Sequence, residues 1–156
     1  MVDIDDWGTC PEFFEFMDYI WGPHTVDRFA SYLNKKLMRF NSKFWSPGVE
    51  AVDAFSQNWK NEINWIVPPI SMICKAIKHL IFCKAKGTLI VPKWPSSAFW
   101  TMIFKKGLVY QPYVVDVLEF KPNQKIFIHG INVNSLFGSA VFSSCVLAVR
   151  LNAEFM

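Results

Sequence analysis

Hydrophobic residues recur at helical spacing in two stretches of the chain. In the first, residues 10–22, apolar side chains follow one another at intervals of three or four, Pro11 suits the first turn, and Gly22 ends the helix. The second stretch begins at Ile70 and ends at Gly87. Its apolar positions are Ile70, Ile73, Ile77, Leu80 and Ile81, and its polar positions are Lys75, Lys78 and His79. This spacing predicts an amphipathic helix in each stretch.

Other apolar stretches are typical of strands. Residues 63–67 form an apolar run that Pro68 and Pro69 stop. Residues 88–92 form a continuous run of the kind that is buried on both faces of a parallel sheet. Four further strands are expected over residues 24–31, 113–120, 125–130 and 143–152, the last three separated by turn residues, and residues 49–55 are expected to form a short strand or a turn around Asp53.

The order of these elements predicts an α/β fold. A third helix is expected over residues 96–107, from an N-cap at Ser96 or Ser97 to a stop at Gly107. Strand and helix alternate up to this point and only strands follow, which is typical of an open α/β sheet with antiparallel strands at its C-terminal end. At 156 residues the chain fits one domain. We divide it into a helical lead-in (1–22), a core (23–107) and a β-rich tail (108–156).

Composition favours a folded protein without a membrane span. Hydrophobic residues make up 52% of the chain and charged residues 19%, which excludes a disordered tail. Apolar runs are shorter than the roughly 18–20 residues that cross a bilayer, and the acidic start MVDIDDWGTC is no signal peptide. We therefore expect a cytoplasmic or nuclear protein. Its four cysteines form no CxxC pair, so free thiols and no metal site are expected.

Charged residues are unevenly distributed. No Lys or Arg precedes Arg28, whereas the span between Glu62 and Asp116 contains no acid. The lysines of that span are Lys75, Lys78, Lys84, Lys86, Lys93, Lys105 and Lys106. A basic surface neutralises phosphates, so the sequence predicts contact with DNA or RNA, with His79 solvated or facing a phosphate. The alternative is a set of solvated polar faces on amphipathic helices.

Three strand ends carry the candidate site residues. Ligands bind beyond the carboxyl ends of the strands in an open α/β sheet. The first end is Asp27, with Asn34 downstream, the second is Asp53, and the third is the VPPI loop, Val67 to Ile70. Two prolines make this loop rigid, so it can hold backbone carbonyls toward a substrate. The ordinary alternative is an exposed aspartate in a turn, or a proline that ends a strand.

Other reaction classes lack their motifs. The chain contains no glycine-rich dinucleotide or P-loop pattern and no GxSxG elbow. Its three histidines are scattered along the sequence. Asp27 and Asp53 alone are too few acids for a two-metal nuclease site.

Five motifs follow one another in a specific order: DDWG, WGPHTVDRFASYLNKKLMRFNS, PGVEAVDAFSQNW, WIVPPI and GTLIVPKWPSSAFW. This order, over roughly residues 5–105, resembles a segment of DIRS- and Ngaro-type retrotransposon polyproteins, which use a tyrosine recombinase. There the segment lies downstream of the reverse transcriptase and ribonuclease H domains. It is in turn similar to phage-type DNA adenine-N6 methyltransferase domains. The resemblance implies a three-layer, Rossmann-like, methyltransferase-type sheet, with residues 23–107 as the methyltransferase-like core.

The methyltransferase resemblance also implies a cofactor site. A D-x-x-A-x-x-x-N stretch of that family helps form the S-adenosylmethionine site, and here it would be Asp27, Ala30 and Asn34. A later acid before a tryptophan would correspond to Asp53 and Trp59. The residues themselves indicate no cofactor, so S-adenosylmethionine is implied by the resemblance alone.

The catalytic loop of that family, N-P-P-Y or D-P-P-Y, is altered in this chain. In the family the Asn or Asp and a proline carbonyl bind the adenine amino group, and the Tyr stacks on the flipped base. Here Val67 and Ile70 replace the polar and the aromatic residue, and only Pro68 and Pro69 remain. The resemblance therefore implies a methyltransferase-like fold that has lost methyl transfer.

These observations favour a non-catalytic, degenerate methyltransferase-like module. It would act by contact with nucleic acid, or with neighbouring reverse transcriptase and ribonuclease H domains, which the 17% aromatic content also fits. Two alternatives stay open. One is an active S-adenosylmethionine-dependent DNA adenine-N6 methyltransferase with a divergent VPPI loop. The other is a stranded or domesticated transposon fragment with no independent activity.

Overall fold

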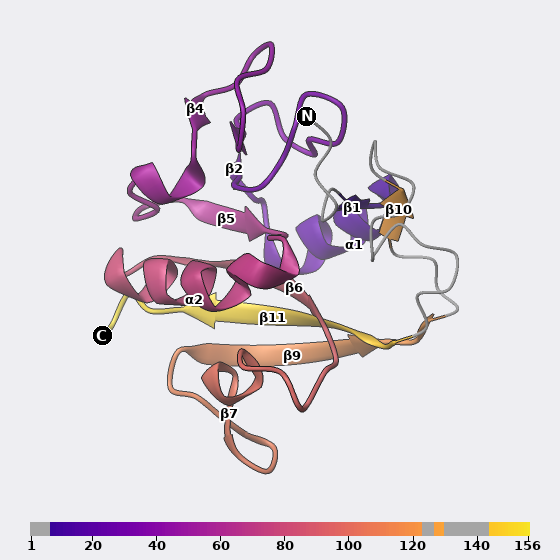
Figure 1. The fold of residues 1–156 in the computed structure, drawn as a ribbon. Coiled ribbons are helices and arrows are strands. Elements are labelled where there is room, and N and C mark those ends of the chain that lie inside the picture. Colours follow the sequence, from indigo (N-terminus) through magenta and orange to yellow (C-terminus); the bar gives the residue numbers. More distant parts are fainter. Residues whose placement is uncertain (1–6, 123–126, 130–143) are drawn as a thin grey trace.

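A five-stranded sheet forms the centre of the protein. The computed structural model describes residues 7–122, 127–129 and 144–156 (Figure 1). The strand order is β2 (Val26–Asp27), β5 (Ile63–Ile66), β6 (Lys86–Pro92), β11 (Val146–Asn152) and β9 (Val114–Phe120). β2, β5 and β6 pair in parallel, and β11 pairs antiparallel with both β6 and β9. Because β9 and β6 both oppose β11, only β11 runs against the other strands, and the mixed α/β sheet is mostly parallel.

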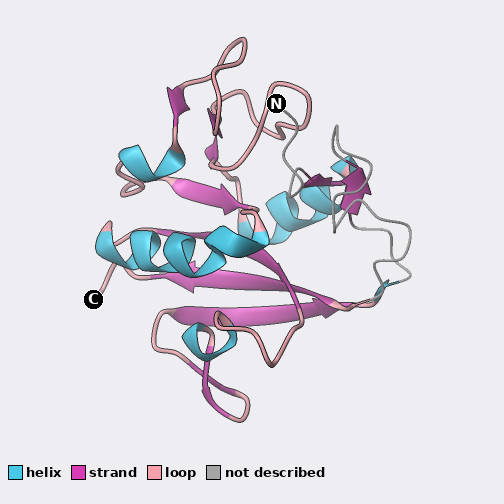
Figure 2. Ribbon diagram, in the orientation of Figure 1, coloured by secondary structure: helices cyan, strands magenta, loops and turns pink. Residues whose placement is uncertain are grey.

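Two helices pack against this sheet. They are α1 (Pro11–Trp21) and α2 (Ile73–Phe82), and both confirm the helical spacing of their apolar residues (Figure 2). Successive residues of β6 serve different helices: Ile90 packs in the cluster that contains α1, whereas Leu89 and Val91 pack in the cluster that contains α2. Because successive strand residues point to opposite faces, the two helices cover opposite faces of the sheet.

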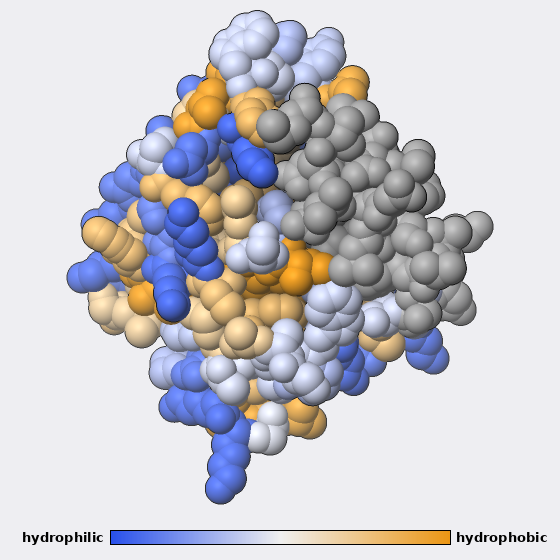
Figure 3. Space-filling model, viewed as in Figure 1, coloured by the Kyte–Doolittle hydropathy of each residue, from blue (hydrophilic) through white to orange (hydrophobic). Residues whose placement is uncertain are grey.

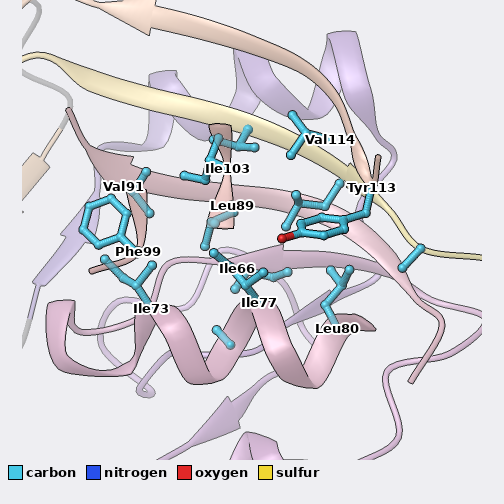
Figure 4. Close-up of a cluster of buried hydrophobic side chains, with 14 of the residues drawn as sticks. Ile66, Ile73, Ile77, Leu80, Leu89, Val91, Phe99, Ile103, Tyr113 and Val114 are labelled. Carbon is cyan, nitrogen blue, oxygen red and sulfur yellow. The ribbon is translucent and has the colours of Figure 1, made fainter. Parts of the chain in front are cut away.

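The larger hydrophobic cluster lies under α2. Figure 4 shows Ile73, Ile77 and Leu80 of α2 directed toward Leu89 and Val91 of β6. Residues of the C-terminal tail complete this cluster, among them Tyr113, Val114, Leu147, Val149 and Leu151. The lead-in, core and tail predicted from the sequence therefore share the sheet and its two clusters.

The remaining elements are short. Three 3-10 turns lie wholly within the described residues: η1 (Ala54–Ser56), η2 (Ile70–Met72) and η3 (Trp100–Met102). Three two-stranded sheets pair β1 (Trp7–Thr9) with β10 (Phe127–His129), β3 (Asn41–Ser42) with β4 (Ala51–Val52), and β7 (Phe104–Lys106) with β8 (Val109–Tyr110). The strand expected over residues 24–31 and the strand or turn expected over 49–55 are thus present as two-residue strands. The turn at residues 130–139, and parts of the strands expected over 125–130 and 143–152, lie outside the described residues.

The prediction of a helix over residues 96–107 is wrong. Only η3 is helical there, and β7 follows it. The reason is long-range: the carbonyl of Met102 accepts a hydrogen bond from the Tyr113 hydroxyl, and the carbonyl of Ile103 accepts one from the Gln111 backbone N–H. The Thr101 carbonyl is taken by the Gln111 side chain. These carbonyls are therefore unavailable to a continuing helix.

The second predicted helix also ends earlier than expected. α2 stops at Phe82, and Gly87 lies inside β6, where it pairs with Asn64 of β5. A Cβ at Gly87 would lie 2.9 Å from the Asn64 Cβ and would collide with the Asn64 carbonyl oxygen. Gly87 is therefore a strand residue that permits close approach of two backbones.

No helix within the described ranges is long and apolar enough to cross a membrane.

Gly87→Ala should destabilise the protein by about 2 kcal/mol or more, because β5 and β6 must separate to admit the methyl group. Gly107→Ala is the matched control: its Cβ would meet nothing within 4 Å, so only its φ of +61° matters, at about 1–2 kcal/mol. Chemical denaturation of both variants measures the difference. Equal or smaller loss for Gly87→Ala would contradict the packing described here.

Candidate functional site

A small polar pocket lies beyond the carboxyl ends of β2 and β5. These strands are parallel neighbours, and Asp27 pairs with Trp65. The pocket is lined by Gly8, Thr9, Asp27, Phe29, Asn34, Lys36, Trp65 and Val67. Two of the three predicted strand ends therefore meet here: Asp27 with Asn34, and the first residue of the VPPI loop. This is the position that an open α/β sheet offers to a ligand.

The Asp27 carboxylate holds the loop that follows β2. Its side chain is buried, and its Oδ2 accepts a hydrogen bond of 2.9 Å from the Lys36 backbone N–H. Burial raises the pKa of Asp27 to about 6, although the N–H groups of Lys36 and Phe29 and the Lys36 charge act in the opposite direction. Asn34 shapes the same loop, since its Oδ1 accepts from the Ser31 N–H at 2.7 Å. Asp27 and Asn34, two of the predicted cofactor residues, thus already have hydrogen bonds within the loop.

Thr9 and Lys36 are pocket residues that the sequence did not indicate. Thr9 is 2% exposed, and its hydroxyl has no hydrogen-bond partner among the described residues. The Lys36 ammonium donates to the Asn34 carbonyl at 2.8 Å, and burial lowers its pKa. Thr9 reaches the pocket because β1 packs beside Asn34, a contact between distant segments that no local pattern signals.

The pocket is too small for a whole S-adenosylmethionine molecule. The space within it that a water-sized sphere can enter is about 10 Å³, room for about one water molecule. Pockets that bury drug-sized ligands measure about 300–1,000 Å³. Because the Asp27 carboxylate and the Asn34 amide are also engaged within the chain, the residues present do not fit the complete cofactor.

The VPPI loop serves the hydrophobic clusters. Val67 is 5% exposed and packs in the α1 cluster, and Ile70 packs against both clusters. The Pro69 carbonyl accepts a hydrogen bond of 2.9 Å from the Met72 N–H in the first turn of η2. The loop thus directs no polar side chain toward the pocket, and one of its carbonyls is already bonded.

Asp53 and Ala30 lie outside the pocket lining. Asp53 is exposed, has a φ of +70°, and caps η1 by accepting from the Phe55 N–H at 3.0 Å. Ala30 contributes only its backbone N–H, which donates to the Asn41 carbonyl. The second predicted strand end, Asp53, therefore has a local role in a turn, as the ordinary alternative expects.

The predicted lysines do not share one face. Lys86 pairs with Glu154 at 3.7 Å and Lys93 with Glu119 at 2.8 Å, and these two lysines flank the opposite ends of β6. Their partners come from the tail, outside the acid-free span. Lys105 and Lys106 lie on β7, Lys84 follows α2, and Lys75 and Lys78 are exposed on α2.

His79 is half-buried and held by contacts within the chain, whereas a solvated or phosphate-facing ring was expected. Its ring packs against Trp59 with centroids 4.7 Å apart, and its Nε2 lies 2.7 Å from the Gln57 carbonyl oxygen. The Cys83 Sγ lies 3.4 Å from the same nitrogen. Because a carbonyl can only accept, this nitrogen carries the hydrogen and cannot take a proton from the thiol. His79 and Cys83 are therefore not a catalytic dyad.

His24 joins α1 to the sheet in an arrangement that resembles a catalytic triad. Its Nδ1 lies 2.8 Å from the Asp18 carboxylate and its Nε2 lies 2.7 Å from the Thr88 hydroxyl. His24 is 5% exposed and Thr88 only 1%, so no substrate reaches the hydroxyl. Burial lowers the pKa of His24. Asp18, His24 and Thr88 therefore form a structural hydrogen-bond network.

Neither a set of metal ligands nor a similarity to a known protein adds to the chemistry of this site. Within the described ranges, no group of three or more His, Cys, Asp or Glu residues could hold a metal ion. No protein-family model matches the chain, and a search of the curated proteins finds no match.

Asp27→Asn should change how stability depends on pH. The folded-state pKa of about 6 lies above the unfolded value of 3.8, so wild-type stability falls as pH rises through this window. Asparagine keeps an oxygen that accepts the Lys36 N–H but does not ionise. Relative to wild type, the variant should gain about 2–3 kcal/mol between pH 4 and pH 7. Denaturant unfolding of both proteins at the two pH values measures this change, and the His24 titration cancels in the difference. A difference in stability between the two proteins that does not change with pH would contradict a raised pKa for Asp27.

Proposed function

We propose that the chain is a non-catalytic, methyltransferase-like module that acts by contact with nucleic acid. The observation that carries this proposal is the pocket at the carboxyl ends of β2 and β5, where Asp27 and Val67 lie together. In a Rossmann-like, methyltransferase-type sheet this is the place of the cofactor and catalytic loops. The helices on opposite faces of the sheet support the same reading of the fold.

The absence of methyl transfer follows from the residues of the pocket and loop. A DNA adenine-N6 methyltransferase needs acceptors for the adenine amino group and an aromatic ring on the flipped base. Val67 and Ile70 supply neither, and both are packed in hydrophobic clusters. The Pro69 carbonyl is bonded to Met72, and the pocket is smaller than the cofactor requires. An active enzyme with a divergent loop is therefore the less favoured alternative.

The ancestry we propose is a segment of a DIRS- or Ngaro-type retrotransposon polyprotein. It is supported by the order of motifs over roughly residues 5–105. In such a polyprotein the neighbouring reverse transcriptase and ribonuclease H domains process nucleic acid, so a non-catalytic module beside them has nucleic acid within reach. Exposed lysines on α2 and β7 supply the positive charge that phosphates require.

The wild-type protein should transfer no methyl group from labelled S-adenosylmethionine to adenine-containing DNA. The double variant Val67→Asn, Ile70→Tyr should also remain at background, because neither change enlarges the pocket or frees the Pro69 carbonyl. Incorporation is measured by filter-bound radioactivity, and circular dichroism checks that the variant is folded. Incorporation by wild type, or a gain in the folded double variant, would establish the active-enzyme alternative.

Nucleic-acid binding should weaken steadily as salt concentration rises. Each phosphate neutralised by a lysine contributes about 0.7 to the slope of log affinity against log salt for a single strand, and about 0.9 for duplex DNA. Titrations of a labelled oligonucleotide at several salt concentrations measure the slope. Affinity that is absent at low salt, or that salt does not change, would contradict a phosphate-binding role.

A further inference from the structure

The outer side of α2 presents two lysines and a phenylalanine on one face. Lys75, Lys78 and Phe82 are exposed and follow one another at intervals of three and four residues, which places them along one side of the helix. The opposite side is buried in the sheet cluster through Ile73, Ala76, Ile77 and Leu80. We call Lys75, Lys78 and Phe82 the α2 stripe. Figure 3 shows hydrophilic side chains standing above hydrophobic surface in this part of the molecule.

The charges of the α2 stripe are available to a ligand. Unlike Lys86 and Lys93, neither Lys75 nor Lys78 forms an ion pair with a described acid. The Lys75 ammonium lies 4.2 Å above the centroid of the Phe55 ring, which holds the charge at the surface of η1. Asp53 is the acid closest to Phe55 in the sequence. Its carboxylate accepts a hydrogen bond from the Phe55 backbone N–H.

The aromatic residue of the α2 stripe lies in solvent. Phe82 is 76% exposed, although a ring of this size is normally buried. It follows Lys78 by one helical turn, so a ring and an ammonium group lie side by side along the helix. Lysines that bind phosphates beside aromatic rings that stack on bases are the two components of single-strand recognition.

We propose that the α2 stripe binds single-stranded nucleic acid, with Lys75 and Lys78 on successive phosphates and the Phe82 ring against a base. This inference rests on the nucleic-acid contact of the proposed function and specifies its surface and the form of its ligand. A duplex hides the faces of its bases, so it can use the lysines but not Phe82. Single strands should therefore bind more tightly than duplexes, and only single strands should depend on Phe82.

The lysine test compares two variants with the same change in net charge. Lys75→Ala, Lys78→Ala should lower the salt slope for a labelled single strand by about 1.4, because two phosphate contacts are lost at about 0.7 each. Lys43→Ala, Lys60→Ala removes two exposed charges that lie outside α2 and outside the acid-free span, and should leave the slope nearly unchanged. Fluorescence anisotropy measures both. Alanine favours helices, so the α2 variant should fold, and circular dichroism checks this.

The aromatic test compares two exposed phenylalanines. Phe82→Ala should weaken single-strand binding at least about fivefold and leave duplex binding unchanged. Phe155→Ala, at a ring that is 91% exposed near the C-terminal end, should change neither.

The outcomes separate this inference from the proposed function. Wild-type binding that both α2 variants retain would overturn the α2 stripe while the nucleic-acid contact stands. Failure of the wild type to bind either form would overturn both. Equal weakening of duplex and single-strand binding by Phe82→Ala would overturn the single-strand assignment.

Discussion

The arrangement of the protein depends on the buried amide of Asn64, which joins three strands of the central sheet. Asn64 is 0% exposed. Its Nδ2 donates to the carbonyls of Trp59 and Lys86, at 3.0 and 2.8 Å, and its Oδ1 accepts from the Arg28 Nε at 2.7 Å. A buried amide is stable only when its polar atoms are paired, so β2, β5 and β6 must meet in this register. Gly87, which has no Cβ, leaves space for the Asn64 backbone carbonyl and Cβ.

That register determines what lies at the carboxyl ends of the strands. Arg28 is held under the sheet edge by the amide oxygens of Asn64 and Asn41, and burial lowers its pKa to about 10, so it stays charged at neutral pH. Asp27, one residue earlier, is thereby directed into the pocket beside Val67. The buried acid reduces stability at neutral pH, which is characteristic of positions whose surroundings are not optimised for stability alone. The pocket thus lies at the sheet edge where open α/β sheets bind ligands.

Elements whose determining contacts are local could be predicted from the sequence. The spacing of Ile73, Ile77 and Leu80 located α2, and the apolar run of residues 88–92 located β6. The meeting of Asp27 with Val67 followed from the rule that carboxyl ends of parallel strands share an edge. The predictions that were wrong depend on contacts between residues far apart in the sequence. Carbonyls after Trp100 are taken by Gln111 and Tyr113, the Lys86 and Lys93 charges are paired with Glu154 and Glu119, and Thr9 enters the pocket through β1. No window of sequence contains both members of such a pair.

Under the proposed function, the pocket has the position of a methyltransferase site but does not accept S-adenosylmethionine. Isothermal titration calorimetry of the folded wild-type chain with S-adenosylmethionine tests it most directly. Because the pocket has room for only about 10 Å³ and its Asp27 carboxylate is engaged with Lys36, we predict no saturable heat up to about 1 mM ligand. Saturable binding that is lost in the Val67→Trp variant, which fills the pocket, would contradict the claim and identify a working cofactor site.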